Sequence, residues 1–106
     1  MSRTDLEHLH DALLHFDIAV HYATEQPLDQ KAIDAICMRI AAGVDALDGV
    51  SRELRDQLFG DTWPAMWGMR NRIAHTYALV EESVVVATVR KDLPELRARI
   101  EAHVQG

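Results

Sequence analysis

Apolar residues recur every three or four positions along almost the whole chain, and this spacing constrains its fold more than any other feature. Residues at this spacing share one face of an α-helix, so we predict amphipathic helices packed around one core. The first helix is expected from about Thr4 to Ala23. Pro27 then interrupts the pattern, and Asp29 is a suitable N-cap for the second helix. The two apolar stripes are Leu6, Leu9, Leu13, Phe16 and Val20, then Ile33, Ile36, Cys37, Ile40, Val44 and Leu47.

Helix boundaries in the middle of the chain follow from residues that favour helix ends. Ser51 is a suitable N-cap for a short helix, and Gly60 is a suitable end for it. Asp61 or Thr62 is expected to cap the next long helix, with Pro64 in its first turn, where the missing N–H costs little. The apolar side of this helix is predicted to consist of Trp63, Met66, Trp67, Ile73 and Ala74.

The C-terminal part of the chain is less regular. Residues 83–89 are rich in β-branched side chains, which favour strands, but a lone strand would have no partner. We therefore predict a buried helix there. Asp92 is a candidate N-cap for the closing helix, and Pro94 is expected to bend or break that helix. The predicted fold class is all-α: an antiparallel four-helix-type bundle in a single domain over residues 1–106.

Charge, hydropathy and cysteine content limit the possible functions. The formal net charge of −6 argues against broad nucleic-acid binding, so an RNA-directed role would need a local basic patch. The sequence contains no apolar run long enough to span a bilayer and no recognisable signal peptide. Its single cysteine, Cys37, cannot form an internal disulfide and is expected in the core. These features predict a cytoplasmic protein without a membrane partner.

The segment 63–77 carries most of the chemically informative residues. On a helical wheel Arg70 lies near the middle of the apolar stripe, where a charge is costly unless it is paired or faces a cleft. Asn71 and His75 are four positions apart, so they lie one above the other beside that stripe. Tyr77 falls in the same sector as Arg70. Arg72 is expected to point away into solvent.

These residue types suit phosphate chemistry. Arginine binds phosphate through two parallel hydrogen bonds and balances transition-state charge, and histidine exchanges protons near neutral pH. RNA needs no metal for cleavage, because its own 2′-hydroxyl can act as the nucleophile. An inward arginine in a bundle is, however, more often the partner of a structural ion pair, and Asp17 or Asp45 could pair with Arg70. The residues alone leave both interpretations open.

Other patterns carry less weight. His8 and His10 point in different directions on a helix, and the sequence lacks zinc-site spacings, so we expect no metal site. A glycine-rich phosphate loop is also lacking, and no cofactor is expected. Trp63 and Trp67 could stack on nucleic-acid bases, but at helical spacing tryptophans more often serve packing.

The motif formed by Arg70, Asn71, His75 and Tyr77 resembles the signature of the HepT-like toxins, which belong to the HEPN ribonuclease group. That group carries an Arg followed by a polar residue, then a His, with a Tyr two positions later. The resemblance covers nearly the whole chain and extends to Asp92, Leu93, Pro94 and Leu96 downstream. One departure concerns the second helix, where the family usually has Gly-Glu-Ala. This chain has Gly43, Val44 and Asp45, so Asp45 would supply the acidic group one position later, or that role is missing.

The resemblance implies a specific activity. HEPN toxins are metal-independent endoribonucleases in which two Arg–His motifs meet in a homodimer cleft. By this analogy Arg70 would stabilise charge on the phosphate, His75 would act as general acid or base, and Asn71 would position RNA or the catalytic groups. Family members are paired with a minimal nucleotidyltransferase (MNT) antitoxin that transfers AMP to the tyrosine of the motif, here Tyr77.

Two other functions remain open at this stage. The chain could be a non-catalytic helical subunit that helps a nucleotidyltransferase bind a nucleotide or a partner, and its acidic balance favours this alternative. It could also be a dimeric bundle in which the arginine is purely structural. DNA is not an expected partner under any of these interpretations, and the sequence does not identify the RNA.

Overall fold

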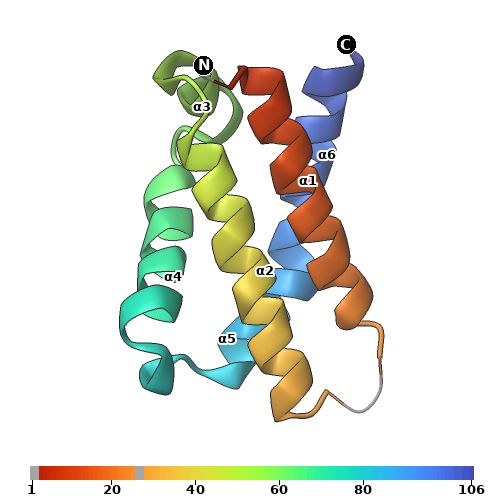
Figure 1. The fold of residues 1–106 in the computed structure, drawn as a ribbon, viewed down its shortest axis with the longest axis vertical. Helices are drawn as coiled ribbons and strands as arrows, with labels where there is room; N and C mark the ends of the chain where they lie inside the picture. Colours follow the sequence, from red (N-terminus) through yellow and green to blue (C-terminus); the bar gives the residue numbers. More distant parts are fainter. Residues whose placement is uncertain (1–2, 26–27) are drawn as a thin grey trace.

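A computed structural model describes residues 3–25 and 28–106, which form an all-α bundle (Figure 1). No β-strand occurs within these two ranges, so the predicted fold class is confirmed and residues 83–89 are helical. Pro27, predicted to separate the first two helices, lies outside the described residues. The long elements are α1 (Asp5–Tyr22), α2 (Gln30–Asp48), α4 (Trp63–His75) and α6 (Leu93–Gln105). The shorter ones are α3 (Arg52–Phe59), η1 (Tyr77–Leu79), α5 (Glu82–Ala87) and η2 (Thr88–Asp92).

The bundle is organised around the α1–α2 pair. These two helices lie side by side, α6 packs against α1, and α4 packs mainly against α2 (Figure 1). The core between them is apolar, and no polar or charged side chain is buried among residues 3–25 and 28–106. The largest fully buried side chains are Phe16, Phe59, Leu9, Ile36, Ile40, Leu47, Leu93 and Ile100.

The buried face of α1 differs slightly from its predicted stripe. Leu6 is 51% exposed, although it was predicted to lie on the apolar face. Alanines form much of the true buried face, which comprises Leu9, Ala12, Phe16 and Ala19. On a helical wheel Leu6 lies about 100° from the centre of that face. A prediction that considers only the large apolar residues, and not the alanines, therefore places the buried face of α1 at the wrong angle around the helix.

Two of the predicted helix caps are present. The side chain of Asp29 accepts a hydrogen bond from the N–H of Ala32 at 2.9 Å, and Ser51 accepts one from Leu54 at 3.4 Å. Thr62 precedes α4, but its hydroxyl donates to the carbonyl of Phe59 instead of capping the helix. The beginnings of α2 and α3 are thus fixed by local side-chain chemistry.

The C-terminal helical stretch is continuous. The interruption predicted near Pro94 takes the form of the π-helical stretch η2. Proline has no N–H to donate and its ring collides with the preceding turn, so a wider turn before it relieves the mismatch. The N–H of Leu93 bonds to the carbonyl of Thr88, five residues earlier. The prediction that Asp92 caps the closing helix was wrong, because the helical stretch continues through it. Asp92 has helical backbone angles, and its side chain makes no capping hydrogen bond.

A polar contact joins the beginnings of α1 and α3. The carboxylate of Asp5 accepts hydrogen bonds from both the backbone N–H and the hydroxyl of Ser51, each at 2.8 Å. These two bonds hold the pKa of Asp5 below its ordinary value of 3.8. A carboxyl whose pKa is lowered by folding stabilises the fold above its unfolded pKa, and this contribution is lost as pH falls through the folded pKa.

We expect the Asp5→Asn variant to be less stable than the parent by about 1 kcal/mol at pH 7, because one carboxylate oxygen is replaced by a donor facing Ser51. The difference should shrink as pH falls through the lowered pKa of Asp5, where the carboxylate of the folded parent becomes protonated. Urea unfolding followed by circular dichroism at several pH values measures it. The exposed Glu53→Gln variant on α3 is the control. Equal stability of Asp5→Asn and parent at pH 7 would contradict the expectation.

Candidate functional site

The guanidinium of Arg70 is held on three sides in the middle of α4. Its Nε donates to Oδ1 of Asp45 on α2 at 2.7 Å, and its Nη1 donates to Oδ1 of Asn71 at 3.1 Å. Its central carbon lies 5.0 Å from the centroid of the Trp67 ring, a cation–π distance. The side chain is still 25% exposed, and Nη2 has no hydrogen-bond acceptor within residues 3–25 and 28–106. The contacts with Asp45, Asn71 and Trp67 therefore hold the guanidinium in one orientation and leave part of it accessible to solvent.

The choice between two acidic partners for Arg70 is now decided. Asp45 pairs with Arg70, whereas Asp17 on α1 pairs with Arg97 on α6. Asp45 is half exposed, so its ion pair with Arg70 is a surface contact whose value lies more in orientation than in stability. Arg70 therefore has the acidic partner that a structural ion pair requires, and within residues 3–25 and 28–106 this pair leaves Nη2 without a hydrogen-bond acceptor.

An aromatic stack continues from Arg70 along α4. The rings of Trp63 and Trp67 are stacked, with centroids 5.8 Å apart and planes inclined by 26°. The guanidinium of Arg55 on α3 lies 4.7 Å from the centroid of the Trp63 ring, so an arginine lies over each of the two tryptophans. Both rings also pack against the core, which agrees with the predicted packing role.

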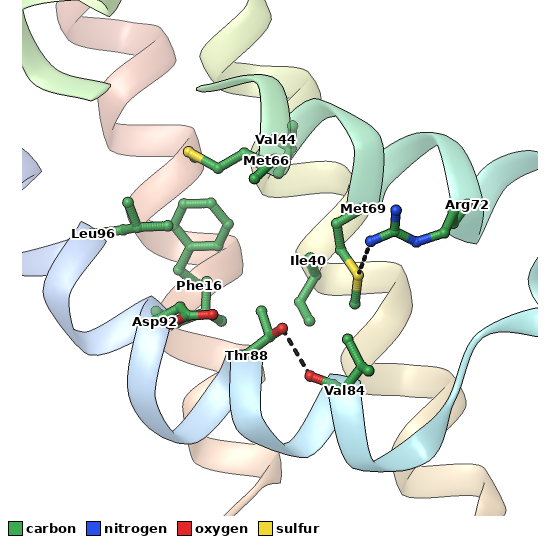
Figure 2. A pocket seen from close by; sticks show the side chains of 12 residues that line it. Phe16, Ile40, Val44, Met66, Met69, Arg72, Val84, Thr88, Asp92 and Leu96 are labelled. Atoms are coloured by element: carbon green, nitrogen blue, oxygen red, sulfur yellow. Dashed lines mark hydrogen bonds between the residues drawn. The ribbon is translucent and has the colours of Figure 1, made fainter. Parts of the chain in front are cut away.

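The buried face of α4 overlaps only in part with the predicted apolar side: Met66 is buried as predicted, and Trp63, Trp67 and Ile73 are partly buried against the core. Met66 and Met69 are its buried residues, and Ala74 is exposed. The two tryptophan rings lie at the flank of the buried face, where the arginine side chains shield them from solvent. Arg72, expected to point away, is exposed, but its Nη2 turns back to 3.8 Å from the sulfur of Met69 (Figure 2).

His75 and Tyr77 lie at and beyond the C-terminal end of α4. His75 is the last residue of the helix and is exposed, one turn after Asn71. Thr76 leaves the helical conformation, so Tyr77 does not continue the helical wheel on which it was predicted. Tyr77 instead begins the short turn η1 and is 38% exposed. The predicted residues Arg70, Asn71, His75 and Tyr77 thus lie on one segment, within and just after α4.

Sequence reasoning missed the partner of Tyr77. Its hydroxyl donates a hydrogen bond to Oδ1 of Asp34 on α2, and the same oxygen accepts a bond from the side chain of Gln30 at 2.8 Å. The Asp34 carboxylate, followed by burial, raises the pKa of Tyr77 above its ordinary value. In turn, the bond from Tyr77 and then that from Gln30 lower the pKa of Asp34. No local pattern could reveal this pair, because 43 residues separate the two side chains.

A pocket of about 240 Å³ lies between α4, α2 and the α5–α6 stretch (Figure 2). Its walls are mainly apolar side chains that include Phe16, Met66 and Met69, and its polar lining comes from Arg72, Thr88 and Asp92. The hydroxyl of Thr88 is already used, since it donates to the carbonyl of Val84 at 2.8 Å. Arg70 and His75 do not line this pocket, so it is separate from the candidate site.

Two further findings concern the whole described part of the chain. Within residues 3–25 and 28–106, no group of three or more His, Cys, Asp or Glu side chains is arranged to hold a metal ion. Over the same residues, none of the helices combines the length and the apolar character needed to cross a membrane.

Comparison with known families decides the class of this bundle. The family model described as "Ribonuclease HepT-like" matches residues 9–103, which is nearly the whole chain. The chain belongs to the HepT-like ribonuclease family. No curated protein and no solved structure gives a significant match. The matched range of this HepT-like chain contains the complete segment from Arg70 to Tyr77, and the resemblance predicted from that segment is confirmed for the family.

Family membership also gives meaning to the position of Asp45. In this HepT-like chain Asp45 follows Gly43 by two positions, one position later than the acidic residue expected from the resemblance. Its carboxylate reaches Nε of Arg70 from that position. The departure from the pattern has therefore not removed an acidic partner for the arginine of the motif.

Proposed function

We propose that this HepT-like chain is the toxin of a toxin–antitoxin pair and a metal-independent endoribonuclease that acts as a homodimer. The observation that carries the proposal is the oriented, partly exposed guanidinium of Arg70, with His75 on the same helix, in a chain of a ribonuclease family. An arginine needed only for stability would gain little from this half-exposed ion pair. An oriented arginine whose Nη2 has no acceptor among the described residues suits a phosphate ligand.

The proposed reaction is an internal transesterification of RNA. The 2′-oxygen attacks the adjacent phosphorus, the bond from phosphorus to the 5′-oxygen breaks, and a 2′,3′-cyclic phosphate and a 5′-hydroxyl are formed. One His75 accepts the proton of the 2′-hydroxyl, and the His75 of the second copy donates a proton to the leaving oxygen. Arg70 binds the non-bridging oxygens, where negative charge accumulates. Asn71 keeps Arg70 in place through Nη1.

A homodimer also accounts for RNA binding by a chain of net charge −6. Two copies of Arg70 around one cleft would form a local positive site, since this side chain lies on α4 and is partly exposed. The affinity for RNA should then fall only moderately with added salt, because few phosphate contacts carry the binding. Light scattering of the purified chain gives its oligomeric state directly.

The proposal is tested by incubating the purified chain with single-stranded RNA in the presence of EDTA. We expect cleavage with 2′,3′-cyclic phosphate ends, and no cleavage of the same oligonucleotide when it is made of DNA. Mass spectrometry of the products identifies the ends. Cleavage that requires added Mg²⁺, or no cleavage of any RNA by the parent chain, would contradict the proposed activity.

The regulatory part of the proposal concerns Tyr77. A neighbouring MNT-type nucleotidyltransferase would transfer AMP from ATP to the hydroxyl of this residue, which is 38% exposed. The added phosphate would place negative charge and bulk two residues after His75 and repel the RNA backbone. Intact mass of the chain co-expressed with such a neighbour should rise by whole AMP units. If the Tyr77→Phe variant shows the same mass increase as the parent, another residue is the AMP acceptor.

The acidic net charge favours one other function, that of a non-catalytic subunit binding a nucleotide or a transferase. Under this alternative the chain would associate with its partner without cleaving RNA. The cleavage assay in EDTA separates the two functions.

Asp45 provides a graded test of the arginine's role. We expect Asp45→Asn to slow RNA cleavage about tenfold, because the neutral amide no longer fixes the guanidinium through a charged hydrogen bond. Asp17→Asn is the matched control, since Asp17 also pairs with an arginine on another helix but lies outside the site. Single-turnover rates of both variants decide the matter. If Asp17→Asn slows cleavage as much as Asp45→Asn, the effect is a general loss of stability.

A further inference from the structure

The unmodified side chain of Tyr77 ties the segment after α4 to the beginning of α2. Its hydroxyl donates to Asp34, whose carboxylate is itself oriented by Gln30 one turn earlier. The buried thiol of Cys37, one turn further along α2, also lies close to the phenol. Tyr77 is therefore fixed against one face of α2, although its ring is partly exposed.

The segment that this bond fixes is otherwise weakly attached. Residues 76–79 are exposed, and Leu79 has 77% of its surface in contact with solvent. Its backbone bonds are local: the N–H of Thr76 bonds to Arg72 at 2.9 Å, and that of Leu79 bonds to Thr76 at 2.9 Å. Local bonds fix the shape of a turn but not its place on the bundle. The Tyr77–Asp34 hydrogen bond fixes the place of the turn on the bundle, because it reaches a different helix.

His75 depends on this attachment. It is the last residue of α4, where helices fray most readily, and it precedes Tyr77 by only two positions. Loss of the tie between Tyr77 and α2 would free the final turn of α4 and with it the imidazole. A displacement of about 1 Å of a catalytic group can cost a factor on the order of 100 in rate.

We propose that Asp34 is a positioning residue for RNA cleavage, which holds Tyr77 and thereby the end of α4 that carries His75. We further infer that AMP transfer to Tyr77 inhibits the enzyme by breaking this tie, in addition to filling the cleft. Both statements rest on the ribonuclease function and the acceptor role of Tyr77 proposed above.

The chemistry of the modification requires the tie to break. The phenolic oxygen attacks the α-phosphorus of ATP, the new oxygen–phosphorus bond forms, and the bond to the departing pyrophosphate breaks. The phenolic proton is lost in this step, so the modified Tyr77 has nothing to donate to Asp34. Its phosphodiester also carries a negative charge beside the Asp34 carboxylate, and two like charges at that separation repel.

Unmodified variants separate this mechanism from simple blocking of the cleft. If AMP acted only by its bulk and charge, Tyr77→Phe would cleave RNA as fast as the parent. Positioning by Asp34 predicts instead that Tyr77→Phe and Asp34→Ala each lower the single-turnover rate by about 10-fold to 100-fold, with RNA affinity nearly unchanged. Asp34→Asn should retain part of the activity, because its amide oxygen still accepts a bond from the phenol.

Two further measurements make the test specific. The double variant Asp34→Ala/Tyr77→Phe should be no slower than either single variant, because both remove the same contact. Amide hydrogen exchange over residues 75–80 should become faster in each variant, while exchange in α1 stays unchanged. Tyr22→Phe, which alters the other tyrosine of the chain, is the matched control for Tyr77→Phe.

Several results would overturn the proposal. Parent-like cleavage by Tyr77→Phe or Asp34→Ala would show that neither residue positions His75. Unchanged amide exchange over residues 75–80 would show that the Tyr77–Asp34 hydrogen bond does not hold this segment in place. Additive losses in the double variant would show that the two residues act separately. If the parent chain cleaves no RNA, the ribonuclease function fails and the positioning role falls with it, whereas the exchange data still decide whether Asp34 holds Tyr77.

Discussion

Replacement of His75 by Ala is expected to lower the rate of RNA cleavage by about 10²- to 10⁴-fold, the usual contribution of a positioned acid or base. The fold should be unaffected, because His75 is exposed at the end of α4 and no part of its side chain belongs to the core. Arg70→Ala should lose about 10²- to 10³-fold, since it removes charge stabilisation from the transition state. Single-turnover kinetics with saturating protein measure both losses.

The Arg70→Lys variant sharpens this prediction. A lysine keeps the positive charge, but its single ammonium cannot contact Asp45, Asn71 and a phosphate in the planar arrangement of a guanidinium. We therefore expect Arg70→Lys to bind RNA almost as well as the parent and to cleave it almost as poorly as Arg70→Ala. His10→Ala, an exposed histidine on α1, is the control for His75→Ala. Parent-like cleavage by His75→Ala would refute the assignment of the general acid or base.

The sequence predicts how Arg70, Asn71 and His75 lie relative to one another, because all three belong to one helix. Arg70, Asn71 and His75 lie within two turns of one helix, and helical geometry alone places them relative to one another. Their partners could not be predicted in the same way. Asp45 is 25 residues from Arg70, and Asp34 is 43 residues from Tyr77. Periodicity shows which face of a helix is apolar, but not which helix lies against it.

The limits of periodicity are visible in α4. The large rings of Trp63 and Trp67 dominate the predicted apolar stripe but are only partly buried. The buried residues are Met66, which was predicted, and Met69, which was not. A tryptophan whose face is covered by an arginine loses most of its contact with water without entering the core. Helix beginnings were more predictable at Asp29 and Ser51, since a cap bonds to a backbone N–H only three residues away. At Asp92 the local signal failed, because the π-helical stretch before Pro94 keeps the helix continuous.

Gly43 is expected to be the position where adding a single methyl group destabilises the bundle most. A Cβ atom there would lie 2.3 Å from Cε1 of Phe16 and within 2.8 Å of two further ring atoms. Phe16 is fully buried on α1, so Gly43 is what allows α1 and α2 to approach each other at this level. We expect Gly43→Ala to lower the free energy of unfolding by about 2 kcal/mol, the usual cost of overpacking a core.

Gly68→Ala supplies the matched control for this prediction. Gly68 is also inside a helix, but the nearest atom to an added Cβ is Nη1 of Arg72 at 3.7 Å, an ordinary contact. Alanine should therefore stabilise α4 there by about 0.5–1 kcal/mol, because glycine has the poorer helix propensity. The pocket beside Phe16 gives its ring some room to move, which limits the cost at Gly43. Urea unfolding should thus separate the two variants by about 3 kcal/mol, and equal stabilities would mean that α1 and α2 lie further apart than described.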